Sequence, residues 1–184
     1  IGVEAKLVKN SNDILDSDKL ILPGVGSLDY GMIKLKESGL IEAIVYHSVE
    51  KKKPLLGICL GMQMLGLRSE EGTEYGLGLI PFESKKFTFR NSENLKIPHM
   101  GWNNVTFDPN SDQILNNLNG KQRYYFVHSY HAVCKNSENI LMECDYGYSF
   151  VAAVKNNNIY GVQFHPEKSH LFGMRLLENF ARSK

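Results

Sequence analysis

Residues 53–65, KPLLGICLGMQML, decide the fold of this chain. The apolar residues before Gly57 predict a buried strand, and the apolar spacing after Gly61 predicts a helix. A strand that turns sharply into a helix, with glycines flanking one reactive side chain, has the pattern of a nucleophile elbow, where the backbone is strained and crowded. Cys59 occupies the tip, and a helix N-terminus there favours the thiolate. The pattern therefore predicts a nucleophilic cysteine, and the alternative is a buried structural thiol.

Length, charge and cysteine content limit the class of protein. The chain has 184 residues, 21 of them basic and 20 acidic, with a formal net charge of +1. This balance gives no indication of nucleic-acid or anionic-membrane binding, and no apolar run approaches the ~20 residues of a membrane span. The three cysteines include no Cys-x-x-Cys pair, so we expect neither a disulfide framework nor a metal site. A reducing compartment, the cytoplasm, is the expected location. We expect one domain over residues 1–184 that lacks an N-terminal strand and helix, because the pattern begins abruptly at Ile1.

The first third of the chain predicts an α/β fold. Residues 2–8 alternate like a short strand, residues 20–22 form a compact apolar strand, and residues 32–50 have helical spacing. Strands alternating with helices favour a mostly parallel central sheet flanked by helices, as in flavodoxin-like folds. Ligands gather at the carboxyl ends of such strands, so the glycine-rich turn at 23–27 and the elbow are expected to face one site.

From residue 77 onward the chain is richer in strand patterns. These lie at residues 77–81, 86–89, 97–105 (beginning as a loop), 124–131, 150–154 and 159–164, with a turn predicted at 90–94. Residues 155–158 favour a turn that joins the last two strands as a hairpin. Apolar residues close the chain on one helical face, at Phe172, Leu176, Leu177 and Phe180. The α/β framework is therefore expected to carry a β-rich insertion.

A base for the cysteine is predicted at residues 163–167, QFHPE, directly after the last strand. A cysteine nucleophile needs a base to take its proton, and that base needs an acceptor to fix its tautomer. His165 and Glu167 are residues of these two types. Attack on an amide also needs an oxyanion hole. The N–H of Leu60 and one from the turn at 23–26 fit that need, although a tight turn explains those glycines equally well.

Five ordered segments resemble a known family. PGVG at 23–26, GICLGMQ at 57–63 and HPE at 165–167 together resemble the class I (triad-type) glutamine amidotransferases. PHMGWN at 98–103 and FVHSY at 126–130 are similar to the glutaminase subunits of imidazole glycerol phosphate synthases. The resemblance covers essentially the whole chain and lacks only the family's opening strand and the loop that follows it.

The resemblance implies hydrolysis of L-glutamine to glutamate and ammonia without a cofactor. Cys59 would attack the side-chain amide to form a γ-glutamyl thioester. His165 would carry protons, and Glu167 would orient it. The N–H groups of Val25 and Leu60 would form the oxyanion hole, and the Val25 peptide is expected to flip for this.

Substrate contacts are also implied by the resemblance. They would come from Gly26, Gln63, Glu71 and the backbone of Ser129 and Tyr130. Glu71 would attract the α-ammonium group, and Gln63 lies one turn along the elbow helix. The alternative for Glu71 is a solvated acid on the surface.

A partner is implied because free ammonia is mostly protonated at neutral pH. In the family, ammonia passes through a shielded route to a (β/α)8-barrel cyclase subunit in histidine biosynthesis, and the two subunits form a heterodimer. Met100, Trp102 and Tyr125 are predicted at that interface. We expect partner docking to switch on the oxyanion hole, which would leave the isolated chain a poor glutaminase.

Other functions stay open at the level of sequence. Paralogues of this subunit supply ammonia for amidation of a sugar in surface-polysaccharide pathways, and residues 168–174 look somewhat more like them. The same scaffold serves γ-glutamyl hydrolases, cysteine peptidases and catalytically silent subunits. A metal hydrolase using His165, Glu167 and His170 has suitable residue types but no further ligand cluster.

The remaining histidines and cysteines receive no chemical role. His47 falls on a helix pattern and is expected at the surface. His99 and His128 lie inside the motifs of the resemblance, without a side-chain role that the sequence supports. Cys134 and Cys144 are expected to be structural thiols.

Overall fold

The strand that precedes the elbow lies inside the sheet. In the computed structural model, which describes residues 1–89 and 95–183, β2 (Leu55–Cys59) is buried over its full length. It lies between β1 (Leu20–Gly24) and β10 (Ile159–Val162), and both are parallel to it. A strand covered on both faces reads as a continuous apolar run, which explains its sequence. The parallel arrangement predicted beside the elbow is therefore confirmed.

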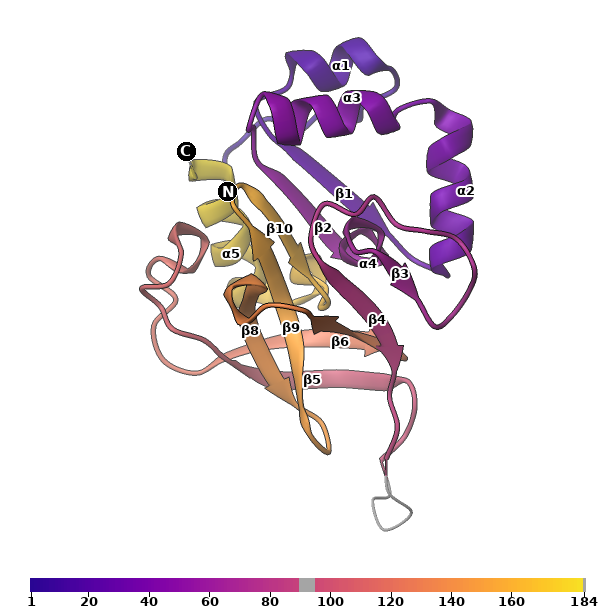
Figure 1. Ribbon diagram of the computed structural model, residues 1–184. Coiled ribbons are helices and arrows are strands. Elements are labelled where there is room, and N and C mark those ends of the chain that lie inside the picture. The colour runs from indigo at the N-terminus through magenta and orange to yellow at the C-terminus, as the bar shows by residue number, and fades with distance from the viewer. Residues whose placement is uncertain (90–94, 184) are drawn as a thin grey trace.

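The rest of the sheet is mixed. The strand order is β1-β2-β10-β9-β7-β4-β3, with β5, β6 and β8 paired off this path. The further strands are β3 (Arg68–Ser69), β4 (Phe82–Lys86), β5 (His99–Thr106), β6 (Gln122–His128), β7 (Tyr130–Cys134), β8 (Ile140–Asp145) and β9 (Ser149–Asn156). Except for the parallel pair β3–β4, these strands pair antiparallel. Figure 1 shows β5 and β6 running across the ends of the other strands, as the expected β-rich insertion.

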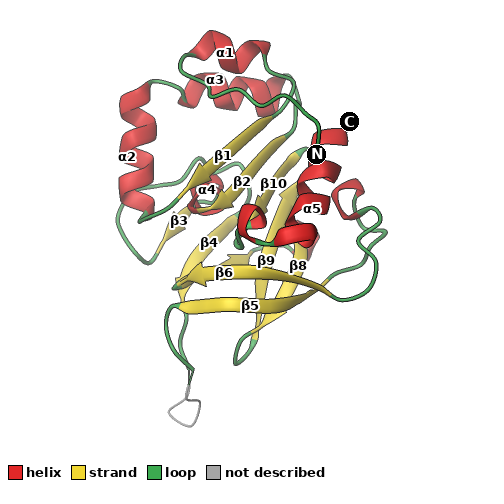
Figure 2. Cartoon of the chain, turned by 180° about the vertical axis from the view of Figure 1, so that it is seen from behind, coloured by secondary structure: helices red, strands yellow, loops and turns green. Residues whose placement is uncertain are grey.

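Helices cover both faces and one end of the sheet. They are α1 (Ser11–Asp16), α2 (Leu28–Ser38), α3 (Ile41–Val45), α4 (Leu60–Leu65) and α5 (His170–Arg182). Figures 1 and 2 show α4 and α5 on opposite faces. Neighbouring residues of β2 accordingly belong to different core clusters: Leu55 packs in the cluster of Met62, and Leu56 in that of Leu176. The α/β prediction is confirmed, and no helix in the described residues is long and apolar enough to cross a membrane.

Two segments expected to be strands are not. Residues 2–8 form neither helix nor strand and are almost entirely exposed, because an extended segment needs a hydrogen-bonding neighbour to become a strand. Residues 77–81 precede β4 instead of forming a strand. Their N–H groups bond to the end of α4, from Leu77 to the Met64 carbonyl (2.7 Å) and from Leu79 to the Leu65 carbonyl (2.9 Å). These bonds satisfy carbonyls that the end of a helix leaves unpaired.

The helix expected over residues 32–50 is divided. It ends at Gly39, whose φ of 67° is a left-handed C-cap, and resumes in α3 and a π-helical turn over Tyr46–Glu50. This wider turn directs His47 inward, where it is 1% exposed and its Nε2 donates to the Ser17 carbonyl at 3.2 Å. The expectation of a surface His47 was wrong.

Later elements agree better with expectation. The hairpin of β9 and β10 is confirmed, and Leu176 and Phe180 are buried on α5. Residues 97–105 and 124–131 are largely strand. Of residues 86–89, only Lys86 is strand, as the last residue of β4. The turn predicted at 90–94 lies outside the described residues. Neither α1 nor β8 was expected.

Candidate active site

The elbow, residues 57–61, has the strained geometry that its sequence predicts. Cys59 has φ 53° and ψ −110°, a conformation that costs a non-glycine residue energy. A Cβ on Gly57 would lie 2.6 Å from the Gly61 carbonyl oxygen, and a Cβ on Gly61 would lie 1.7 Å from the Leu22 carbonyl oxygen. Both glycines are therefore required by close backbone approach, and the turn is held at the end of β1 and β2.

The Cys59 thiol is buried behind this turn. It is 8% exposed, and burial raises its pKa to about 11, so the thiol is protonated at neutral pH. Two donors act in the opposite direction, the Leu60 N–H and Gln163 Nε2, which lies 3.8 Å from the sulfur. Gln63 Nε2 in turn donates to Gln163 Oε1 at 3.1 Å. Sequence reasoning missed Gln163, although it lies only two residues before the His-Pro-Glu motif.

The histidine corner, residues 163–169, holds the predicted base. His165 is 3% exposed, and its Nδ1–H donates to Glu167 Oε1 at 2.6 Å. Its backbone N–H donates to the Tyr125 carbonyl at 2.9 Å, and its carbonyl accepts from Ser169 Oγ at 2.6 Å. Ser169 Oγ also accepts from the Tyr125 N–H at 3.0 Å. The fully buried Ser169 therefore joins the histidine corner to β6, a role that no motif signalled.

The two halves of the predicted triad lie at or just after the ends of the neighbouring strands β2 and β10 but are not hydrogen-bonded to each other. Among the described residues, His165 Nε2 is buried without a hydrogen-bond partner. The bond to the Cys59 sulfur comes instead from Gln163, two residues before His165. The charge of Glu167 contributes to the raised pKa of Cys59, so the carboxylate acts on the sulfur electrostatically. A buried nitrogen without a partner is costly, and a thiol proton would satisfy it.

The predicted oxyanion turn lies next to the elbow. Gly24 is the register partner of Cys59 across β1 and β2. Val25 follows with 73% exposure, and Gly26 has a φ of 106° that favours glycine. The structure thus places the N–H groups of Val25 and Leu60 on neighbouring strand ends.

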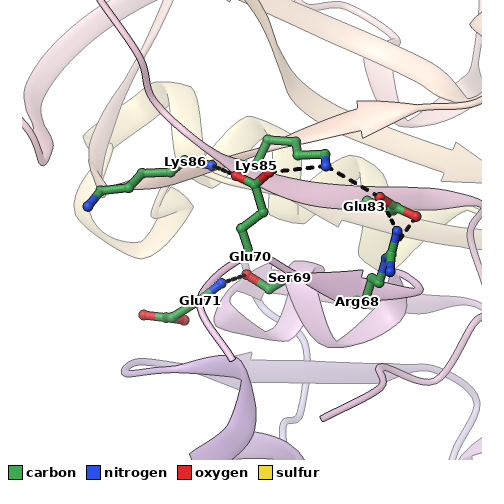
Figure 3. A network of polar contacts seen from close by, with 7 residues as sticks. All are labelled: Arg68, Ser69, Glu70, Glu71, Glu83, Lys85 and Lys86. Atoms are coloured by element: carbon green, nitrogen blue, oxygen red, sulfur yellow. Dashed lines mark hydrogen bonds and ion pairs between the residues drawn. The ribbon is translucent and has the colours of Figure 1, made fainter. Parts of the chain in front are cut away.

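Glu71 reaches the same turn. Its Oε2 accepts from the Leu28 N–H at 3.1 Å, at the start of α2 and two residues after Gly26. Figure 3 shows its carboxylate pointing away from a network of ion pairs that holds its neighbour. In that network, Glu70 pairs with Lys85 at 3.1 Å and Glu83 pairs with Arg68 at 3.0 Å. Of two adjacent acids, only Glu71 is directed to the site.

Ser129 and Tyr130 lie where the chain passes from β6 to β7. The Ser129 carbonyl accepts from the Phe87 N–H at 3.1 Å. Burial is the main cause of the raised pKa of the Tyr130 hydroxyl, and the charge of Glu71 adds to it. The charge of Glu70 raises this pKa as well, so Tyr130 lies within electrostatic range of both acids.

The residues predicted at a partner interface, Met100, Trp102 and Tyr125, lie close together. With His170, which was not predicted there, they are called the aromatic patch. Met100 is 61% exposed and Trp102 is 41% exposed, on the same face of β5. The Trp102 ring stacks on His170 at 5.4 Å and meets Tyr125 edge-on at 6.3 Å. Because the Tyr125 backbone binds His165, the aromatic patch is connected to the histidine corner.

Comparison with known proteins gives consistent matches. The family model of class-I glutamine amidotransferases matches residues 1–183. Imidazole glycerol phosphate synthase subunit HisH 2 of Pseudomonas aeruginosa is 50% identical over 181 residues, covering 98% of this chain and 88% of that protein. The protein of the same name in Methanococcus maripaludis is 51% identical over 182 residues, covering 99% and 89%.

Solved structures show the same fold at lower identity. A crystal structure of a glutamine amidotransferase superposes with a TM-score of 0.69 at 20% identity, covering 98% of this chain and 88% of that one. The structure of PurLQS from Thermotoga maritima gives a TM-score of 0.65 at 24% identity, covering 90% and 79%. These two likenesses support the fold alone.

Proposed function

The chain belongs to the class-I glutamine amidotransferase family, and we propose that it acts in histidine biosynthesis as the glutaminase subunit of an imidazole glycerol phosphate synthase. The observation that carries this proposal is the arrangement of Cys59, His165 and Glu167 at adjoining strand ends of the matching fold. The relatives at 50% and 51% identity bear the name of that subunit.

The proposed chemistry follows from the positions of these groups. Cys59 Sγ attacks the glutamine Cδ while its proton passes to His165 Nε2, the nitrogen that has no hydrogen-bond partner within residues 1–89 and 95–183. The negative oxygen is stabilised by the N–H groups of Leu60 and Val25. His165 then gives its proton to the leaving ammonia, which leaves a γ-glutamyl thioester. Water, deprotonated by His165, cleaves the thioester to glutamate and regenerates the thiol, and Glu167 stabilises the imidazolium throughout.

Glutamine would lie between the elbow and the Ser129–Tyr130 segment. Glu71 is proposed to attract the α-ammonium group, and Gly26 and the backbone of Ser129 and Tyr130 are proposed to contact the rest of the substrate. Gln63 is proposed to act on the substrate indirectly, because its side chain is 6% exposed and bonds to Gln163. Its proposed role is to hold Gln163 against the sulfur of the nucleophile.

The partner is proposed to be a (β/α)8-barrel cyclase subunit that forms a heterodimer and receives the ammonia. The exposed aromatic patch is the surface proposed for it. Tyr125 belongs to this patch, and its backbone also binds His165 directly and through Ser169, contacts called here the clamp on His165. Docking at the patch is therefore proposed to be coupled to the base. We place the complex in the cytoplasm, since its nucleophile must remain a reduced thiol.

Activation by the partner is supported by the resting geometry. The thiol is protonated and bonded to Gln163, and His165 Nε2 has no partner among the described residues. Docking is proposed to join sulfur and imidazole and to turn the Val25 peptide toward the oxyanion.

The test is co-purification of the chain with its cyclase subunit, followed by assay of glutamate and imidazole glycerol phosphate. Cys59→Ser is expected to lower glutamine-dependent turnover by about 10³-fold or more, whereas free ammonia still supports synthesis. Cys134→Ser, at a thiol away from the site, is the matched control and should leave both rates unchanged. Glutamate release that survives in Cys59→Ser would refute the mechanism.

The acceptor of the ammonia is tested in the same experiment. If the glutamine-dependent product is an aminated sugar and the co-purified partner is a different synthase, the proposed role in histidine biosynthesis is wrong. The alternative role in surface-polysaccharide biosynthesis then takes its place. Equal turnover by the isolated chain and the complex would remove the proposed activation.

A further inference from the structure

The chain changes its pairing partners at one point, the β6–β7 corner, defined here as residues 128–130. β6 pairs with β5, and β7 pairs with β4 and β9. Ser129 is the only residue between the two strands. At this corner Ser129 alone lies outside both ladders, and its carbonyl accepts from the Phe87 N–H at 3.1 Å. Side-chain contacts behind the corner therefore add to strand pairing in fixing its orientation.

Two buried histidines lie directly behind this corner. His99 and His128 are register partners on β5 and β6, and they are 3% and 6% exposed. His128 Nδ1 lies 2.8 Å from the Tyr130 carbonyl oxygen, so its hydrogen bond spans the corner. His128 Nε2 lies 3.0 Å from His99 Nδ1.

These contacts determine where the protons are. A carbonyl oxygen only accepts, so His128 must carry its proton on Nδ1. Burial lowers the pKa of His128 to about 3 and that of His99 to about 4, so both rings are neutral at physiological pH. A neutral His128 protonated on Nδ1 accepts at Nε2, and His99 must therefore be protonated on its own Nδ1.

The rings around the pair keep it in place and dry. His99 stacks on Tyr146 at 4.0 Å and on Phe126 at 4.8 Å. His128 lies 5.2 Å from Phe87 and 5.3 Å from Phe150. In such surroundings the imidazole hydrogen bonds have no competition from water and are strongly directional.

We propose that His99 and His128 form a pair of fixed tautomers that positions the β6–β7 corner for glutamine. The pair holds the Tyr130 carbonyl inward, and the corner thereby keeps the shape that binds the α-carboxylate and α-ammonium groups of the substrate. The inference rests on the proposed function. Both histidines are positioning residues, since they act on the substrate only through the backbone of Ser129 and Tyr130.

The test uses two substitutions at one position in the complex with the cyclase subunit. An Asn amide overlies imidazole Nδ1, and a Gln amide overlies Nε2. His128→Gln therefore loses the donor to the Tyr130 carbonyl, and His128→Asn keeps it. We expect His128→Gln to raise the KM for glutamine by about tenfold, with kcat within about threefold, because one hydrogen bond that shapes the binding site is lost. His128→Asn should give a distinctly smaller rise.

Two further readouts separate positioning from general damage. Alkylation of Cys59 by iodoacetamide, which has no α-carboxylate, should proceed at the same rate in both variants and in the parent. His47→Gln, at a buried histidine in the π-helical turn that follows α3, is the control and should leave KM unchanged. In the parent complex, ¹⁵N NMR should show His128 protonated on Nδ1 and bare on Nε2.

The outcomes distinguish the inference from the function beneath it. A parent complex that releases no glutamate from glutamine overturns the proposed function and the inference together. Normal turnover in the parent overturns the inference alone if KM is unchanged in His128→Gln, if both variants raise KM equally, or if His128 is protonated on Nε2. A fall in the alkylation rate that matches the change in KM would likewise overturn it, as structural damage.

Discussion

The elbow and the histidine corner supply the two reacting groups, and they are held by different means. The elbow is fixed by local chain geometry, since Cys59 has φ 53° and two glycines admit close backbone contacts. The histidine corner is fixed by a distant strand, since Tyr125 of β6 binds His165 directly and also through Ser169. A strained turn is rigid on its own, whereas a clamp made by another strand moves with that strand. The base is therefore the half of the site that a partner can adjust.

Removing the base tests the more adjustable half most severely. His165→Asn keeps an amide near Nδ1 for Glu167 and deletes Nε2, the nitrogen proposed to take the thiol proton. We expect kcat for glutamine hydrolysis in the complex to fall about 10³-fold, with the melting temperature little changed. A loss below tenfold would show that His165 is not the base.

Adding one methyl group to the elbow tests the rigid half. In Gly61→Ala the new Cβ would lie 1.7 Å from the Leu22 carbonyl oxygen, so β1 and the elbow must separate. We expect the free energy of unfolding to fall by about 3 kcal/mol or more, measured by denaturant titration. Gly31→Ala is the control, because its Cβ would meet only side-chain atoms of Leu60 and Met64 at 3.0 Å. Equal losses in both would refute the crowding argument.

Weakening the clamp tests whether the base depends on β6. Ser169→Ala deletes the hydroxyl that joins the His165 carbonyl to the Tyr125 N–H. We expect kcat in the complex to fall about tenfold, with a loss of about 1–2 kcal/mol in stability. Ser183→Ala removes a comparable hydroxyl, bonded only within its own helix end, and should leave kcat unchanged. An unchanged kcat in Ser169→Ala would separate the base from β6.

The smallest effect concerns the thiol itself. The pKa of Cys59 is about 11, so alkylation of the isolated chain by iodoacetamide should rise about tenfold per pH unit from 7 to 10. Gln163→Leu removes a donor that lowers this pKa. The pKa should then rise further, and alkylation at pH 8 should slow a few-fold. Faster alkylation in this variant would show that Gln163 shields the sulfur instead of stabilising the thiolate.

The sequence alone determined the parts that depend on local spacing. A strained strand-to-helix turn is predicted by Gly57, Cys59 and Gly61, because the close backbone contacts on either side of the cysteine admit only glycine. The hairpin of β9 and β10 and the apolar face of α5 were predictable for similar reasons, as was the pairing of His165 with Glu167 two residues later.

Only the tertiary structure decided the rest. Residues 77–81 had a strand pattern, but the free carbonyls of α4 took their N–H groups. The roles of Ser169 and Gln163 depend on contacts with residues 44 and 104 positions away, which no local pattern encodes. The same holds for the hydrogen bond between His99 and His128, which exists because β5 and β6 pair in one register. Backbone strain depends on adjacent residues and can be predicted from them. The partners of a buried polar group depend on which distant strands pair in the folded chain.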